Sequence, residues 1–129
     1  EKIHQAMETV DAVIINPAAY SHTSVAIRDA LLMLDIPIIE VHLSNIYQRE
    51  PFRHRSFVSD VATARVAGFG KEGYLMAVRA VAKMVNQEQR KKYTKQRVVK
   101  PKQLKLQVLN LQRKKVHGEN LQVQVDLRQ

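Results

Sequence analysis

Residues 11–16 read DAVIIN, a run of mostly β-branched apolar residues that stops at Pro17. Such residues favour β-strands, and a run that is apolar on both of its alternating faces is typical of a parallel strand buried within a sheet. A second run of this kind, IPIIEV, occupies residues 36–41, and a weaker one, ARVAGF, occupies residues 64–69. The sequence therefore predicts a parallel sheet with these three strands.

Three other stretches have the apolar spacing of amphipathic helices, namely residues 1–10, 25–34 and 72–86. Ser24 or Thr23 is placed to cap the second helix. The side chains expected to face inward are Val25 and Leu32 in the second helix and Leu75, Val78, Ala82 and Val85 in the third. Strands and helices that alternate along a chain predict an α/β layered fold with a parallel sheet.

The composition is that of an ordinary globular domain. The chain has 129 residues, of which 45% are hydrophobic, and no cysteine. The lack of cysteine excludes a disulfide, a thiol nucleophile and a cysteine-ligated metal site. No apolar run reaches the roughly 18–20 residues that a membrane span needs. Since cysteine content does not fix the compartment, the cytoplasm is the default expectation.

The net charge of +9 arises in the last third of the chain. Residues 1–89 carry 9 Lys and Arg against 10 Asp and Glu, whereas residues 90–129 carry 12 against 2. This contrast predicts a near-neutral domain followed by a basic segment of different character.

We divide the chain accordingly into a core domain at residues 1–86, a basic linker at residues 87–103 and two strand-like segments within residues 104–129. The two segments, residues 104–110 and 121–127, alternate apolar and polar side chains as half-buried strands do. They are candidates to complete the same sheet.

Polar side chains gather after the first two predicted strands. They are Asn16 and His22 after the first, and Glu40, His42, Ser44 and Arg53 around the end of the second. Because ligands bind outside the carboxyl ends of parallel strands, residues 16–24 and 42–55 are expected to share one crevice. A carboxylate two residues before a histidine, on the same strand face, is typical of a general acid held in orientation. With the guanidinium of Arg53, the group predicts a site for a small polyhydroxylated anion.

Each of these residues also has a simpler interpretation. His42 alone is compatible with a surface histidine, and Asn16 before a proline is a common turn residue. A metal site formed by His22, His42 and His54 lacks the compact spacing of histidine ligands.

A different class of function is a binding module whose basic tail contacts nucleic acid or an acidic partner. Residues 90–115 contain 11 Lys and Arg and no acidic residue, which favours phosphate contacts. The segment has one aromatic residue, Tyr93, and no recognised nucleic-acid motif, so nucleic-acid binding is the less favoured alternative.

Four stretches, in unbroken order, resemble motifs of type II 3-dehydroquinate dehydratase. They are NPAAYSHTSVAIRD at residues 16–29, IEVHLSN at residues 39–45, REPFRHRS at residues 49–56 and GFGKEGY at residues 68–74. The resemblance covers about residues 1–85. It implies a flavodoxin-like three-layer sandwich and the dehydration of 3-dehydroquinate to 3-dehydroshikimate through an enolate. The reaction belongs to the shikimate route to aromatic amino acids or to quinate metabolism, and the family uses no metal or organic cofactor.

The resemblance also implies residue roles. His42 protonates the departing hydroxyl and Glu40 orients it. The substrate-binding residues that it implies are Asn16, His22, Asp29, Leu43, Ser44 and Arg53. Leu43 and Ser44 act through their backbone amides, and Asp29 reaches the site of a neighbouring subunit. The implied assembly is a homododecamer built from trimers.

The resemblance does not extend to the family's lid, which carries the proton-abstracting tyrosine and its activating arginine. The alternative is therefore a catalytically impaired dehydratase-like subunit. Residues 106–110 and 123–129 faintly resemble the family's first two strands. This likeness gives the hypothesis that the N-terminal strands are permuted to the chain end, which requires residues 105–109 and 122–127 to pair parallel with the strand at residues 12–16. The other possibility is an unrelated basic extension.

Overall fold

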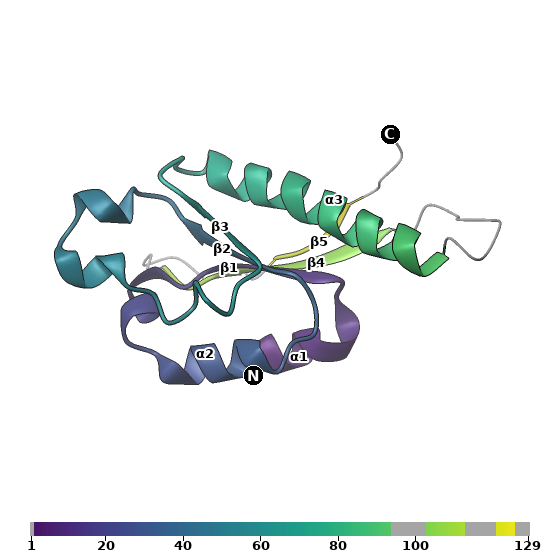
Figure 1. Cartoon of the computed structure of the whole chain (residues 1–129), viewed down its shortest axis with the longest axis horizontal. Coiled ribbons are helices and arrows are strands. Elements are labelled where there is room, and N and C mark those ends of the chain that lie inside the picture. The colour runs from purple at the N-terminus through teal and green to yellow at the C-terminus, as the bar shows by residue number, and fades with distance from the viewer. Residues whose placement is uncertain (1, 94–102, 113–120, 126–129) are drawn as a thin grey trace.

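The computed structural model describes residues 2–93, 103–112 and 121–125. Within them, five strands form one sheet that lies between two layers of helices (Figure 1). In chain order the elements are α1 (Lys2–Thr9), β1 (Ala12–Asn16), η1 (Ala18–His22), α2 (Val25–Leu32), β2 (Ile38–His42), η2 (Ile46–Gln48), η3 (Pro51–His54), β3 (Ala64–Ala67), α3 (Glu72–Tyr93), β4 (Leu104–Asn110) and β5 (Leu121–Val125). The η elements are 3-10 helices. The expected α/β layered fold is confirmed.

The strands are arranged in the order β3-β2-β1-β4-β5. β1 lies parallel to both β2 and β4, and β3 lies parallel to β2. All residues of β1 and of β2 are buried, as their apolar runs predicted. The carboxyl ends of these parallel strands therefore meet at one edge of the sheet.

Alternate strand residues face opposite helix layers. α3 covers one face of the sheet, and α1 and α2 cover the other (Figure 1). The core on the α3 side includes Ile14, Ile39, Leu106, Ala77 and Val81. The core on the other side includes Val13, Ile15, Ile38, Ala6 and Leu31. Each face of the sheet thus has its own apolar core.

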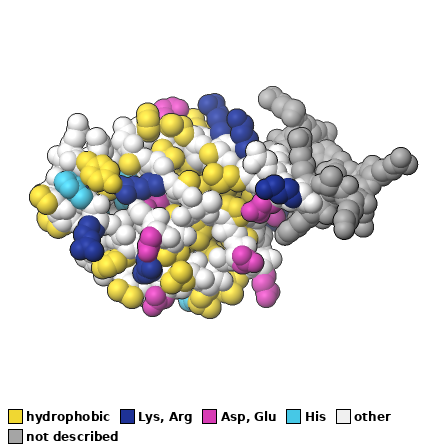
Figure 2. All heavy atoms as spheres, viewed as in Figure 1, with side chains coloured by type: hydrophobic (Ala, Val, Ile, Leu, Met, Phe, Trp, Pro, Cys, Tyr) yellow, Lys and Arg dark blue, Asp and Glu magenta, His cyan; other side chains and the backbone are white. Residues whose placement is uncertain are grey.

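The inward face predicted for α2 was wrong. Val25 and Leu32 are 54% and 58% exposed, whereas Leu31 is fully buried. Leu31 lies one turn after Ile27, and this pair forms the stripe that packs on the sheet in so short a helix. The cap is confirmed for Ser24, whose Oγ accepts a hydrogen bond of 3.1 Å from the amide of Ile27. Exposed apolar side chains lie among charged ones across the face seen in Figure 2.

In α3, Val78, Ala82 and Val85 face the core as expected, and Leu75 does not. Leu75 is 51% exposed because Ala77 and Val81 occupy the positions closest to the sheet. α3 continues to Tyr93, past the expected end at residue 86, since good helix formers follow without Gly or Pro. The division into a core, a linker at 87–103 and a tail stays a prediction. No helix in the described part of the chain is long and apolar enough to cross a membrane.

The two tail strands join the sheet, but only one does so as the permutation hypothesis requires. β4 pairs parallel with β1, whereas β5 pairs antiparallel with β4 and not with β1. The hypothesis was therefore wrong in the form stated; residues 126 and 127 lie outside the described part. The physical reason is the connection, because residues 111–120 are too few for a parallel crossover, which needs about a dozen residues or more.

β4 is also more deeply buried than a half-buried strand. Gln107, on the polar side of the alternation, is only 5% exposed, and its Oε1 has no hydrogen-bond partner in the described part of the chain. The strand lies between β1 and β5, so both of its edges are covered.

Candidate active site

The two loops expected to share a crevice lie side by side at the carboxyl edge of the sheet. The amide of Phe57 donates to the carbonyl of Ser21 over 2.7 Å. Nδ1 of His22 donates to the carbonyl of Arg55, also over 2.7 Å. These contacts join η1, which follows β1, to the segment after η3, which follows β2.

The centre of this edge is a buried carboxylate–imidazole pair on β2. Glu40 is 0% exposed and His42 is 5% exposed. His42 Nε2 and Glu40 Oε1 are 2.6 Å apart, the distance of a strong charge-assisted hydrogen bond. Both side chains point to the α1 and α2 side, since they alternate with Ile39 and Val41, which pack on the α3 side. The pairing predicted from the sequence is therefore present.

Two serine hydroxyls complete the surroundings of the Glu40 carboxylate. Ser56 Oγ donates to Oε1 over 2.7 Å, and Ser59 Oγ donates to Oε2 over 2.5 Å. Burial acts to raise the pKa of Glu40, but the hydrogen bonds from His42, Ser59 and Ser56 outweigh it and hold the pKa below its usual value. Glu40 is thus a carboxylate at neutral pH.

The ionised state of Glu40 determines which ring nitrogen of His42 carries the hydrogen that they share. A carboxylate only accepts hydrogen bonds, so Nε2 of His42 carries a hydrogen. Nδ1 is then the ring nitrogen at which a proton can be exchanged with a bound molecule. A histidine fixed in this way can act as a general acid while the carboxylate balances its charge.

Asn16 lies on the other face of the sheet edge. Its Oδ1 accepts from the amide of Ala18 over 3.0 Å, and its Nδ2 donates to the hydroxyl of Tyr74 over 3.0 Å. The side chain is 0% exposed. Burial raises the pKa of Tyr74, and the hydrogen bond from Asn16 offsets part of that rise. Asn16 therefore shapes the turn after β1, and one amide hydrogen remains for a ligand.

Ala18, in the same turn, adopts φ 51°, a left-handed conformation that is strained for a residue with a side chain. The Asx turn of Asn16 holds the chain in this conformation.

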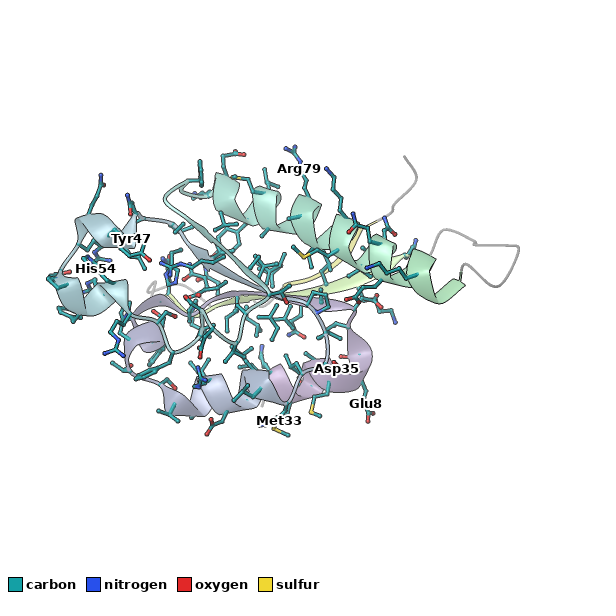
Figure 3. All side chains as sticks on the ribbon, in the orientation of Figure 1. Glu8, Met33, Asp35, Tyr47, His54 and Arg79 are labelled. Atoms are coloured by element: carbon teal, nitrogen blue, oxygen red, sulfur yellow. The ribbon has the colours of Figure 1, made fainter. Side chains whose placement is uncertain are left out.

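Arg53 is engaged on the opposite loop. Its Nε donates to Glu50 Oε2 over 2.6 Å, and its guanidinium carbon lies 4.9 Å from the centre of the Phe52 ring. A bound anion would compete with Glu50 for this guanidinium. The loop also carries Tyr47 and His54, which lie together at the end of the molecule formed by η2 and η3 (Figure 3).

The backbone at His42 and Leu43 is anchored to the glycine-rich turn before α3. The amide of Gly68 donates to the carbonyl of His42 over 3.2 Å, and the amide of Gly70 donates to the carbonyl of Leu43 over 2.9 Å. Gly68 has φ 94°, which a residue with a side chain rarely adopts. This turn fixes the path of the chain directly after His42.

His22 and Asp29 are brought together in a neighbouring hollow of about 730 Å³. Its other lining residues are Val25, Arg28, Phe52, Arg55, Ser56, Phe57 and Asp60. Ser56 is the direct link between this hollow and the Glu40–His42 pair. Of the predicted substrate-binding residues, this hollow holds His22 and Asp29, whereas Asn16, Leu43 and Arg53 make the separate contacts described above.

Sequence reasoning missed Ser56, Ser59, Arg65 and Tyr74. Ser56 and Tyr74 ended two of the quoted motifs, and Arg65 is the one charged residue of the strand predicted at residues 64–69, so these positions carried a signal. Ser59 carried none, because its contact with Glu40 depends on how the loop returns. Among the described residues, no group of three or more His, Asp or Glu side chains is arranged to hold a metal ion.

Comparison with known proteins agrees with this arrangement. A 3-dehydroquinate dehydratase of Enterobacter sp. (strain 638) is 55% identical over 87 residues, which are 67% of this chain and 58% of that protein. One from Proteus mirabilis (strain HI4320) is 61% identical over 79 residues, 61% of this chain and 54% of that protein. The chain thus spans little more than half the length of these curated relatives.

Solved structures give the same result. The type II dehydroquinase from Propionibacterium acnes matches with a TM-score of 0.61 and 51% identity, over 64% of this chain and 60% of that one. The type II dehydroquinase from Butyrivibrio crossotus DSM 2876 matches with a TM-score of 0.59 and 45% identity, over 66% and 57%. Residues 1–82 match the sequence model of the family described as Dehydroquinase class II. With the motifs, the sheet and the Glu40–His42 pair in agreement, the chain belongs to the class II dehydroquinase family.

Proposed function

We propose that this chain catalyses the dehydration of 3-dehydroquinate to 3-dehydroshikimate, as a hydro-lyase of the shikimate or quinate pathway. The observation that carries the proposal is the buried Glu40–His42 pair at the carboxyl edge of the sheet, with a hydrogen bond of 2.6 Å. Membership of the class II dehydroquinase family supports it, as do relatives named 3-dehydroquinate dehydratase.

In the proposed reaction a base removes the proton at C2 of 3-dehydroquinate and leaves an enolate. The C1–OH bond then breaks, the enolate electrons form the C1–C2 double bond, and His42 gives the proton at Nδ1 to the departing hydroxyl, which leaves as water. Glu40 remains ionised throughout. Its negative charge stabilises the protonated His42 ring until His42 transfers the proton from Nδ1. A positioned acid of this kind contributes about 10²–10⁴-fold to a rate.

We propose that the substrate is bound by Asn16, His22, Asp29, Leu43, Ser44 and Arg53. Arg53 supplies a planar pair of donors suited to adjacent hydroxyls or a carboxylate, and must exchange Glu50 for the ligand. His22 and Asp29 line the neighbouring hollow. Leu43 and Ser44 contribute backbone amides next to His42, where the glycine-rich turn holds the chain.

One observation bears on the base of this mechanism and favours the alternative of a catalytically impaired subunit. A tyrosine base needs a phenol that ionises readily. Tyr74, the tyrosine hydrogen-bonded to Asn16, has a pKa raised by burial, which is the wrong direction. The basic segment offers Tyr93 as a stand-in, and the side chain of Tyr93 lies outside the described part.

We further propose a cytoplasmic homo-oligomer, built from trimers into a dodecamer, that uses no metal or organic cofactor. The support is family membership together with the position of Asp29 on an exposed face of α2. A nucleic-acid partner remains the less favoured alternative; the basic segment on which it depends lies mostly outside the described residues.

The test is turnover of 3-dehydroquinate by the full chain, followed by the ultraviolet absorbance of the conjugated enone product. His42→Ala removes the proposed acid, and His4→Ala, on the exposed side of α1, is the matched control. Turnover lost only in His42→Ala supports the proposal. Substrate binding without turnover, measured by calorimetry, supports the impaired subunit instead. Neither turnover nor binding by folded protein would overturn both.

A further inference from the structure

Arg65 on β3 lies directly beside Glu40 in the sheet. The two residues are paired in the parallel register between β2 and β3, so their side chains share a face. Nη1 of Arg65 donates to Ser59 Oγ over 3.1 Å, and Ser59 in turn donates to Glu40 Oε2. A continuous chain of hydrogen bonds therefore runs from Arg65 through Ser59 and Glu40 to His42.

The direction of each hydrogen bond in this chain is fixed. A guanidinium can only donate, so Ser59 Oγ must accept from Arg65, and its single hydrogen is left for Glu40. The same reasoning holds for Ser56, whose Oγ accepts from the amides of Val58 and Ser59 over 3.1 and 3.2 Å. Both hydroxyls are thereby held as donors to the carboxylate. A serine without such a partner could rotate and point its hydrogen elsewhere.

The position of Arg65 leaves one of its buried donors unpaired. Its guanidinium carbon lies 5.5 Å from the centre of the Tyr47 ring, within the range of a cation–π contact. Its Nη2 is buried and has no hydrogen-bond partner within the described part of the chain. An unpaired buried donor is unfavourable, and a shorter apolar residue on this strand would avoid it. Retaining the charge there is better explained by its effect on the neighbouring network than by packing.

We propose that Arg65, acting through Ser59, is a positioning residue that fixes the orientation of the Glu40 carboxylate and so holds the His42 ring with its Nε2 hydrogen on Glu40. This orientation keeps Nδ1 of His42 as the proton-donating nitrogen. Arg65 touches neither His42 nor the expected site of the substrate in this scheme. Its effect on turnover rests on the proposed dehydratase function, whereas its effect on the ring does not.

The test is proton NMR of the full chain without substrate, labelled with ¹⁵N-histidine. The measured quantity is the rate at which the Nε2 hydrogen of His42 exchanges with water, with the signal assigned by its loss in His42→Ala. Exchange requires the His42–Glu40 contact to open. Because one hydrogen bond is lost, we expect Arg65→Met and Ser59→Ala to speed this exchange about fivefold to tenfold.

Two controls separate positioning from general destabilisation. Arg79→Met makes the same charge change on the exposed, outer side of α3 and should leave the exchange rate unchanged (Figure 3). The backbone amide of Ile39 reports opening of β2 itself and should be unaffected in all variants. Arg65→Lys, which restores a donor, should recover most of the wild-type rate.

Exchange in Arg65→Met at the wild-type rate would overturn the inference, and so would equal acceleration at His42 and Ile39. If Arg65→Met does not fold, Ser59→Ala replaces it in the test, because it removes only one hydroxyl. Exchange at the wild-type rate in Ser59→Ala would then overturn the inference. Failure of the proposed function is distinguishable, because it would appear as absent turnover in wild-type protein whose His42 exchange still responds to Arg65.

Discussion

Replacing Glu40 with glutamine tests whether the carboxylate is the organising group of the site. Glutamine has nearly the same shape, but one of its two terminal atoms is a donor. In the native structure Oε1 accepts from His42 and Ser56, and Oε2 accepts from Ser59. In either orientation of the glutamine amide, its NH2 group therefore lies opposite at least one of these hydrogen-bond donors and cannot accept from it. Because hydrogen bonds to a charged group contribute about 1.5–3 kcal/mol each, we expect Glu40→Gln to lower the free energy of unfolding by about 3 kcal/mol.

The loss should depend on pH in a defined direction. The pKa of Glu40 is lowered in the folded state, so its stabilising effect is fully present above the unfolded value, about 4.3, and is lost as pH falls through the folded pKa. Urea unfolding at about pH 7 should separate the variant from the wild type, and the difference should shrink in acid. Glu8→Gln, on the exposed side of α1, is the matched control and should show no such difference (Figure 3). Equal urea midpoints for Glu40→Gln and wild type at neutral pH would refute the reasoning.

Other predictions concern the backbone around the site. Tyr74→Phe removes the acceptor of the Asn16 amide and should lower the free energy of unfolding by about 1 kcal/mol in urea titrations, while an unchanged value would mean that water replaces the hydroxyl. Gly68→Ala forces a residue with a side chain to φ 94° and should lower the free energy of unfolding by about 1–3 kcal/mol, seen as a lower melting temperature. An unchanged melting temperature would contradict the assigned strain. Ala18→Gly should have the opposite sign, raising stability by up to about 1 kcal/mol, because glycine adopts φ 51° without strain, and a loss on calorimetry would show that chain entropy dominates.

The sequence predicted the sheet well because its central strands are short, β-branched apolar runs, which few other secondary structures would accommodate. Residues 11–16 and 36–41 predicted β1 and β2 to within two residues. The rotation of the helices was harder, since Leu31 and Leu32 are equally apolar and only packing decides which is buried. β5 was placed in the sheet but with the wrong direction. Alternation specifies a strand and a face, whereas direction follows from the length of the connection.

The candidate site was predictable as far as residues on one strand are concerned. Glu40 and His42 are two residues apart, so strand geometry alone places them on one face. The hydroxyl of Ser59 reaches the carboxylate only because the loop after η3 returns to the side of β2 that faces α1 and α2, which no local pattern encodes. Arg65 meets the same network only through the register between β2 and β3.

That register explains why the polar network is specific to this arrangement of strands. A slip of one residue between β2 and β3 would place Ala64 or Val66 beside Glu40 and turn Arg65 toward α3. Ala64 and Val66 now pack against the apolar core under α3, so the slip would bury a charge there and leave the Ser59 hydroxyl without its fixed donor. The apolar core on one face of the sheet thus selects the register that completes the hydrogen-bond chain on the other. In this chain the orientation of His42 is a consequence of core packing as much as of the side chain beside it.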